Sequence, residues 1–83
     1  MVFDAAVIGA IGIDTNVYLS GNEVDFSVET SFGENLDCIG QAGGYSSQSL
    51  RRLGHRICFI GYVGEDYFGE HIREVFLDQG IDI

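Results

Sequence analysis

Two short apolar runs, at residues 2–8 and 57–60, most strongly constrain the fold of this chain. They read VFDAAVI and ICFI, and the first is closed by Gly9. Nearly continuous apolar runs of this length are typical of strands buried on both faces, as in parallel sheets. Parallel neighbours need a crossover connection, so we expect one right-handed βαβ unit.

Residues 15–39, between the two runs, follow a different pattern. Three short stretches, 16–19, 25–30 and 36–39, alternate or nearly alternate between apolar and polar residues, and turn-type residues at 20–22 and 32–35 separate them. This pattern predicts three antiparallel strands with one face in water. Because the segment interrupts a βαβ unit, we interpret it as a flap and not as part of the core.

Two helices are expected in the second half. The first follows the glycine-rich residues 40–44, with Ser46 or Ser47 as its cap, and ends at Gly54. Its side chains expected to face the core are Leu50 and Leu53.

The second helix starts near Tyr67 and ends at Gly80, a typical C′ residue. Its apolar side chains recur with helical spacing and form one stripe: Phe68, Ile72, Val75 and Phe76. Residues 81–83 look like the approach to another strand. We therefore expect the chain to stop within a fold.

Length and charge exclude several classes of protein. A chain of 83 residues is enough for one small domain. Its 13 acidic residues face only four basic ones, and the net charge of −9 argues against nucleic acid and anionic membranes as partners. No apolar stretch is long enough to span a bilayer, and Asp4 stands where a signal peptide carries basic residues. A cytoplasmic location is expected.

The cysteines and histidines do not suggest a metal site. Cys38 and Cys58 form no C-x-x-C pair, and His55 and His71 have no ligand spacing with them or with each other. We expect two buried, reduced thiols, with a disulfide between them as the alternative.

Two features suggest ligand binding. Asp14 follows the first strand, where its carboxylate can accept hydrogen bonds from the hydroxyls of a polyol or can cap a turn. Glycines 40, 43 and 44 let backbone N–H groups approach a ligand at the start of a helix, or simply form a tight turn. A Walker-type phosphate loop is not expected, since the chain has no lysine.

Three segments in register resemble the N-terminal third of the PfkB-type (ribokinase-like) carbohydrate kinases. Residues 7–14 read VIGAIGID, residues 40–54 form a glycine-rich turn and helix, and residues 59–69 read FIGYVGEDYFG. The last segment matches the family pattern F-I-G-x-V-G-x-D-x-F-G almost without change. The glycine spacing from Gly54 to Gly64 also fits, and residues 74–83 are similar to the helix and G-[IV]-D sequence that follow in the family.

The resemblance implies a fold and a division of the chain. The fold is α/β, the N-terminal part of a ribokinase-like three-layer fold with an antiparallel β lid inserted after the first strand. Residues 1–14 and 40–83 would form a partial core, and residues 15–39 the lid. Substrate-binding residues carried over by position are Asp14, Gly40, Gln41, Gly43, Gly44 and Tyr45.

Two of these positions depart from the family pattern. Aligned on Leu53 and Gly54, the paired glycines of the family fall on Gly40 and Gln41, and its asparagine falls on Tyr45. That asparagine helps hold the sugar in the family. Tyr45 can stack on a sugar face and donate a hydrogen bond instead.

The function implied is that of an N-terminal fragment of an ATP-dependent kinase of sugars or nucleosides. ATP and Mg²⁺ would serve the complete enzyme, and neither is expected to bind this chain alone. The family's G-A-G-D-type segment, which supplies the catalytic aspartate, does not occur here, so the chain alone is predicted to be inactive.

Two alternatives stay open. The first is a non-catalytic module that self-associates through the lid, giving a homodimer, as lids in this family often do. The second is half of a dinucleotide-binding fold, which lacks its G-x-G-x-x-G fingerprint after the first strand. The sequence does not choose between ribose, fructose, a nucleoside and other acceptors.

Overall fold

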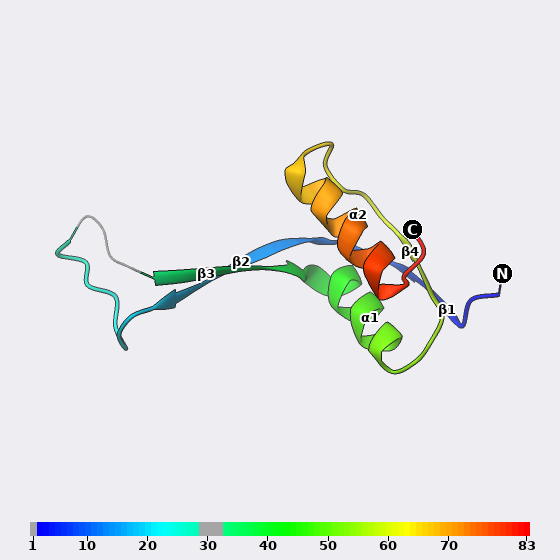
Figure 1. Cartoon of the computed structure of the whole chain (residues 1–83), viewed down its shortest axis with the longest axis horizontal. Coiled ribbons are helices and arrows are strands. Elements are labelled where there is room, and N and C mark those ends of the chain that lie inside the picture. The colour runs from blue at the N-terminus through cyan, green and yellow to red at the C-terminus, as the bar shows by residue number, and fades with distance from the viewer. Residues whose placement is uncertain (1, 29–32) are drawn as a thin grey trace.

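The computed structural model describes residues 2–28 and 33–83 as a compact body with one long hairpin extending from it (Figure 1). The elements follow in the order β1 (Ala5–Ile8), β2 (Gly12–Leu19), β3 (Gly33–Gly40), α1 (Gln41–Arg52), β4 (Ile57–Ile60) and α2 (Tyr67–Gln79). Strands β1 and β4 and both helices form the body. Strands β2 and β3, with the described residues 20–28 between them, form the hairpin, which we call the arm.

Strands β1 and β4 pair in parallel, as the two apolar runs predict. Residues Ile57 and Phe59 of β4 are buried, and the ring of Phe59 meets Phe76 of α2 edge-on, with 5.4 Å between centroids. The alternate residues Ile8 and Ile60 are 76% and 52% exposed. The expectation of burial on both faces is therefore wrong for the described residues, because both helices pack on the same face of the sheet.

Residues beyond α2 add a further parallel contact to this sheet. Asp82 lies beside Cys58: its N–H donates to the Ile57 carbonyl at 3.0 Å, and its carbonyl accepts from the Phe59 N–H at 2.7 Å. Helix α2 therefore connects β4 to the parallel segment at Asp82. In the same way, the connection that contains α1 joins β1 to β4. The sequence predicted a single crossover connection, and the body contains two.

In its described residues the arm has two long strands and not the three short ones expected. Register runs from the Gly12–Gly40 pair to the Leu19–Gly33 pair. Residues 25–28 form a turn and not a strand. The Asp25 carboxylate accepts hydrogen bonds from the Ser27 N–H at 2.9 Å and from the Ser27 hydroxyl at 2.6 Å, and these bonds stabilise the turn. Residues 29–30 of that expected strand and Phe32 of the expected second turn lie outside the described residues. The rest of that expected turn belongs to β3.

Helix α1 begins earlier than its sequence suggests. It starts at Gln41 with Gly40 as N-cap, and no side chain caps it, so the predicted Ser46 or Ser47 cap is wrong. Ser47 is instead fully buried on the inner face. Leu50 packs against the core as expected, but Leu53 is 75% exposed, because the helix ends at Arg52. Gly54 has the left-handed φ of 94° expected after a helix.

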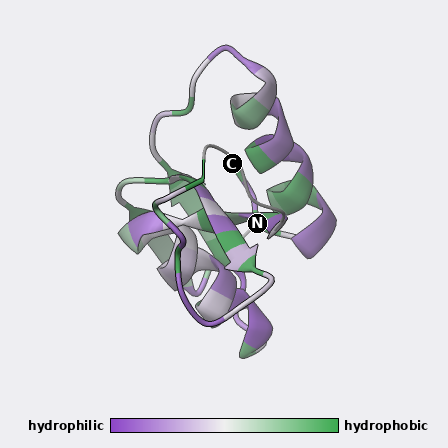
Figure 2. Ribbon diagram, turned by 90° about the vertical axis from the view of Figure 1, so that its left-hand side faces the viewer, coloured by the Kyte–Doolittle hydropathy of each residue, from purple (hydrophilic) through white to green (hydrophobic). Residues whose placement is uncertain are grey.

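Helix α2 confirms its prediction closely. Its N-cap Asp66 accepts the Gly69 N–H at 2.8 Å, and Gly80 closes it with φ 78°. Ile72 and Phe76 are buried. Figure 2 shows the green and purple bands of an amphipathic helix. The stripe is complete except for Phe68, which is exposed near the first turn.

Two further observations concern the helices as membrane spans and the cysteines. Neither helix in the described part of the chain has the length and hydropathy that crossing a bilayer requires. Cys38 and Cys58 are free thiols on β3 and β4, each half-buried and not fully buried as expected.

Candidate functional site

Asp14 and Tyr45 meet where the arm joins the body. Asp14 lies on β2, and Tyr45 lies on the first turns of α1. The Tyr45 hydroxyl donates to Asp14 Oδ2 at 2.6 Å, across 31 positions of sequence. The structure therefore brings together two of the residues singled out from the sequence, and their binding of a substrate stays a prediction.

Gly40 gives the Asp14 carboxylate its position. A Cβ built on Gly40 would overlap both carboxylate oxygens of Asp14. Gly40 is also the N-cap of α1, so the carboxylate lies at the positive end of the helix dipole. The φ of Gly40 is −130°, which suits any residue. Glycine is therefore required here by the space that the carboxylate occupies and not by the backbone conformation.

Gln41 adopts a backbone conformation that favours glycine. Its φ is 67°, the only positive value among the described non-glycine residues. Such a conformation costs about 1 kcal/mol or more outside glycine. Its side-chain Nε2 would lie 2.6 Å from a Cβ at Gly12, so Gly12 leaves room for the amide. The family's second glycine would sit at this left-handed position without strain.

Gly43 and Gly44 are buried and serve close packing in the structure. The Gly43 N–H donates to the Ala10 carbonyl at 2.8 Å, and a Cβ at Gly43 would lie 2.6 Å from that oxygen. A Cβ at Gly44 would lie 2.8 Å from Ile39. These glycines hold α1 tightly against β3 and the β1–β2 connection. Their contact with a sugar stays a prediction.

The bond between the two side chains changes the acidity of the phenol. The pKa of Tyr45 is raised above its ordinary value. The largest cause is the hydrogen bond that the phenol donates to Asp14, and smaller ones are the negative charge of that carboxylate and partial burial. Deprotonation would place two anions in contact, so Tyr45 keeps its hydrogen throughout the neutral pH range.

Two further polar residues share the face of the arm that carries Asp14. Cys38 lies opposite Asp14 in the antiparallel register, and Asn16 follows two residues along β2. The Asn16 amide donates weakly to Cys38 Sγ at 3.8 Å. Neither residue was predicted from the sequence to belong to the site. Period-two alternation from Asp14 would have placed Asn16 on this face.

The body contains hollows elsewhere. One of about 310 Å³ lies between β4 and α2, lined by Phe59, Ile72 and Phe76 among others. Another of about 410 Å³ lies over the uncovered sheet face beside Ile8, Ile60 and Tyr62. Among residues 2–28 and 33–83, no three metal-binding side chains gather at one point.

Comparison with known proteins identifies relatives of the chain. No protein-family model matches it. The chain is 34% identical over 71 residues to the fructokinase of Escherichia coli, which covers 86% of the chain and 23% of that protein. It is 32% identical over 82 residues to the 5-dehydro-2-deoxygluconokinase of Clostridium perfringens, covering 98% of the chain and 22% of that protein.

Solved structures give the same result for the fold. The microbiome-derived acarbose kinase Mak1 superposes with a TM-score of 0.86 over 98% of the chain and 27% of its own length, at 22% identity. Aminoimidazole riboside kinase from Salmonella enterica, solved with aminoimidazole riboside and an ATP analog, has a TM-score of 0.61 at 33% identity, over 94% of the chain and 22% of its own.

The chain thus spans about a quarter of the length of the proteins it matches. The expected α/β fold with its antiparallel insertion is confirmed by these structures, within their N-terminal part. In sequence and in fold, the chain is homologous to the N-terminal portion of fructokinase and other PfkB-type (ribokinase-like) carbohydrate kinases.

Proposed function

We propose that this chain forms the acceptor-binding part of a kinase that transfers a phosphoryl group to a hydroxyl of a sugar or nucleoside. The observation that supports it most directly is the Asp14–Tyr45 pair at the junction of arm and body. A carboxylate held at a fixed position can accept hydrogen bonds from ligand hydroxyls. The relatives named fructokinase and aminoimidazole riboside kinase make a sugar or a riboside the acceptor.

In this proposal each part of the chain has one task. Asp14 accepts hydrogen bonds from the acceptor, and residues 40–45 line its other side. The arm, with residues 15–39, covers the bound acceptor and excludes water, which protects the phosphoryl group from hydrolysis.

The phosphoryl donor is bound outside this chain. Its residues do not fit a nucleoside triphosphate: the sequence contains no lysine and no G-x-x-x-x-G-K-[ST] loop. ATP and Mg²⁺ are therefore proposed for the complete enzyme only, and the chain alone is proposed to be inactive. A first check is the coding sequence after Ile83, which must supply a glycine-rich segment with an aspartate base.

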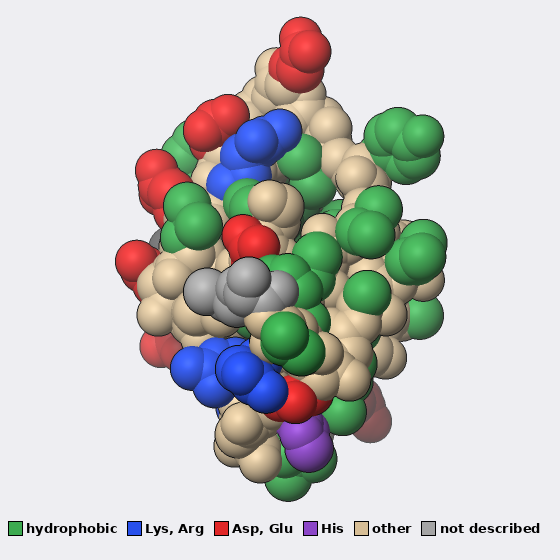
Figure 3. Space-filling view, turned by 90° about the vertical axis from the view of Figure 1, so that its right-hand side faces the viewer, with side chains coloured by type: hydrophobic (Ala, Val, Ile, Leu, Met, Phe, Trp, Pro, Cys, Tyr) green, Lys and Arg blue, Asp and Glu red, His purple; other side chains and the backbone are tan. Residues whose placement is uncertain are grey.

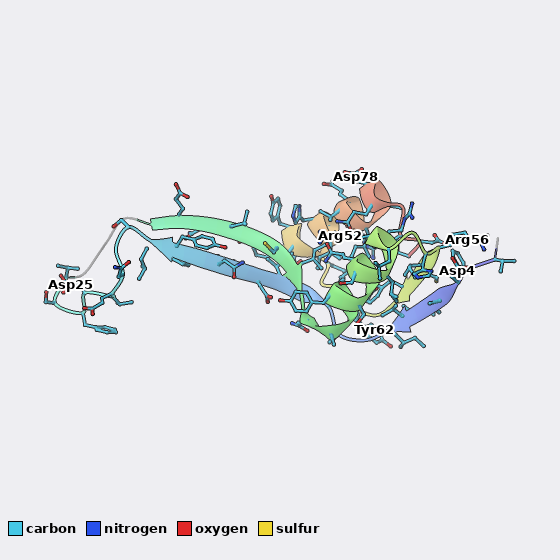
Figure 4. The ribbon with its side chains drawn as sticks, turned by 90° about the horizontal axis from the view of Figure 1, so that it is seen from below. Asp4, Asp25, Arg52, Arg56, Tyr62 and Asp78 are labelled. Atoms are coloured by element: carbon cyan, nitrogen blue, oxygen red, sulfur yellow. The ribbon has the colours of Figure 1, made fainter. Side chains whose placement is uncertain are left out.

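Substitution of Asp14 tests the role of the site. In the protein expressed from the complete reading frame, Asp14→Asn is expected to lower kcat/KM for D-fructose or D-ribose by roughly 10- to 100-fold, the usual cost of a lost charged hydrogen bond. Asp25→Asn, at the far end of the arm in Figure 4, is the matched control. Equal activity of the Asp14 variant and the control would refute the assignment.

Self-association through the arm is the second candidate function. Its strands expose apolar side chains, including Val17 and Leu36, and Phe26 beyond β2 is 92% exposed. Burying such groups between two copies would stabilise a dimer. Because the arm is acidic, association should strengthen with salt. A monomer mass by light scattering at both low and high salt would contradict this candidate.

A further inference from the structure

A hollow of about 400 Å³ lies at the end of the body where both termini lie, opposite to the arm (Figure 1). Its large apolar lining residues are Phe3, Ile57, Leu77 and Ile81. Ile57 and Ile81 are each 1% exposed and form the floor, whereas Leu77 is 61% exposed. Apolar pockets of this kind receive the anchoring side chains of protein interfaces.

Two arginines also line this hollow, and Figure 3 shows arginine and apolar side chains beside one another at this end. Arg51 Nε donates to the Gln79 carbonyl at 2.9 Å, and because a carbonyl is neutral, the guanidinium keeps its full charge. Arg56 forms an ion pair with Asp4 at 3.2 Å, and its side chain is 60% exposed. One acid, Asp82, completes the charged lining. The lining therefore has two positive charges and one negative charge, in a chain whose net charge is −9.

Residues 23–26, at the far end of the arm, have the opposite character, and we call them the arm tip. Phe26 is 92% exposed and Val24 is 55% exposed. Glu23 and Asp25 alternate with these two and are exposed as well. Residues 12–40 contain six acidic residues and no basic one. The arm tip thus presents an apolar ring flanked by carboxylates, which complements an apolar hollow bordered by guanidinium groups.

The arm tip and the hollow of one molecule cannot reach each other. The chain is 56 Å long, and Figure 4 shows Asp25 of the arm tip and Arg56 of the hollow at its opposite ends. A contact between the two surfaces must therefore join two copies. Because the surfaces differ, the contact is heterologous, and each pair of copies keeps a free arm tip and a free hollow.

We propose that the arm tip of one copy of this protein docks in the hollow of a second copy, so that copies associate head to tail. Phe26 enters the apolar part of the hollow, and the burial of its ring stabilises the contact. The carboxylates of the arm tip face Arg51 and Arg56, which fixes the orientation of the arm. This contact differs from the arm-to-arm association considered above, because it uses a surface of the body. It does not depend on the proposed kinase function.

Removal of the aromatic anchor tests the contact. Light scattering on the protein from the complete reading frame is done at an ionic strength of about 0.15 M, where screening over about 8 Å confines charge effects to groups near the contact. Phe26→Ala should weaken self-association at least about tenfold and lower the mean mass at equal concentration. The matched control is Tyr62→Ala, which removes a ring that is 95% exposed on the body and should keep the wild-type mass (Figure 4). Equal masses of the wild type and Phe26→Ala at every concentration would overturn the proposal.

A variant of the hollow separates head-to-tail from arm-to-arm association. Leu77→Asp puts a carboxylate where it repels the acidic arm tip, and the exposed position of Leu77 leaves folding intact. This variant should not self-associate. Mixed in equal amounts with Phe26→Ala, it should form a one-to-one complex that grows no further, since one variant keeps its arm tip and the other its hollow.

Self-association of Leu77→Asp equal to that of the wild type would indicate an arm-to-arm contact and overturn the proposal. Circular dichroism verifies that the variant is folded. If it is not, Arg56→Gln takes its place and should weaken the association about threefold, because it removes one charge from the border of the hollow. Unchanged association of Arg56→Gln would then have the same meaning.

Discussion

The body and the arm of this chain are held together by different forces. The body holds most of the described core, in which Ile57, Ile72 and Phe76 are buried, and only the base of the arm, at Ile39, enters it. Along the arm, from Thr15 to Leu19 and from Gly33 to Asp37, every side chain is exposed, and the strands are joined by their backbone ladder and a few side-chain bonds. Two strands alone are marginally stable in water. The body therefore sets global stability.

The largest expected effect comes from emptying the body's core. Phe76→Ala removes the ring that packs edge-on against Phe59 and should lower the free energy of unfolding by about 3–5 kcal/mol. Phe26→Ala in the arm removes an equal ring that is almost fully exposed, and should change it by less than about 0.5 kcal/mol. Urea denaturation measures both. Similar losses in the two variants would contradict the division of roles.

A smaller effect is expected where helix α1 meets the β1–β2 connection. Gly43→Ala places a methyl group against the Ala10 carbonyl and the Phe59 ring, and should cost about 1–3 kcal/mol. Gly21→Ala, in the arm, places its methyl group in open space and serves as the control. If Gly43→Ala were as stable as the control, the close approach of the helix would be wrong.

Within the arm, one cross-strand bond offers a local probe. The Thr15 hydroxyl donates to Asp37 Oδ1 at 2.6 Å. Thr15→Val keeps the shape and β-branching but removes this donor, at a cost of about 0.5–1 kcal/mol. Hydrogen exchange should become faster in β2 and β3 and stay unchanged in β4. Uniform acceleration in both regions would show that the arm and the body unfold together.

The smallest effect concerns two exposed carboxylates, one in each region. Hydrogen bonds from Arg56 lower the pKa of Asp4 in the body, and those from Ser27 lower the pKa of Asp25 beyond β2. A lowered folded-state pKa adds stability above the ordinary value of 3.8 that is lost as pH falls through the folded-state value. NMR titration should find both midpoints below 3.8. Arg56→Ala should raise the midpoint of Asp4 only in part, because the backbone N–H of residue 56 still donates to Asp4 Oδ2, and should leave that of Asp25 unchanged. A shift of Asp25 in that variant would contradict the independence of the two regions.

Local patterns in the sequence predicted most of the body. The stripe through Ile72 and Phe76 and the glycine at position 80 define α2, because spacing and capping act within one or two turns. Features decided by distant contacts were mispredicted. The outward exposure of Ile8 and Ile60 depends on which sheet face the helices cover, and the burial of Ser47 depends on where α1 begins.

The arm and the candidate site show the same limit. Residues 25–28 have the composition of a strand, but the Asp25 side chain captures Ser27 and turns the chain. Asp14 was singled out by its place after the first strand and Tyr45 by resemblance, yet the bond between them follows only from the packing of α1 on the arm. No spacing rule connects two residues 31 positions apart.

Strand β3 ends at Gly40 and helix α1 begins at Gln41, with no linking residue between them. A swing of the arm about this joint must therefore turn the first residues of α1 or alter the dihedral angles of these two residues. Because Tyr45 lies on the first turns of α1, any such turn of the helix would also displace its phenol relative to the rest of the body.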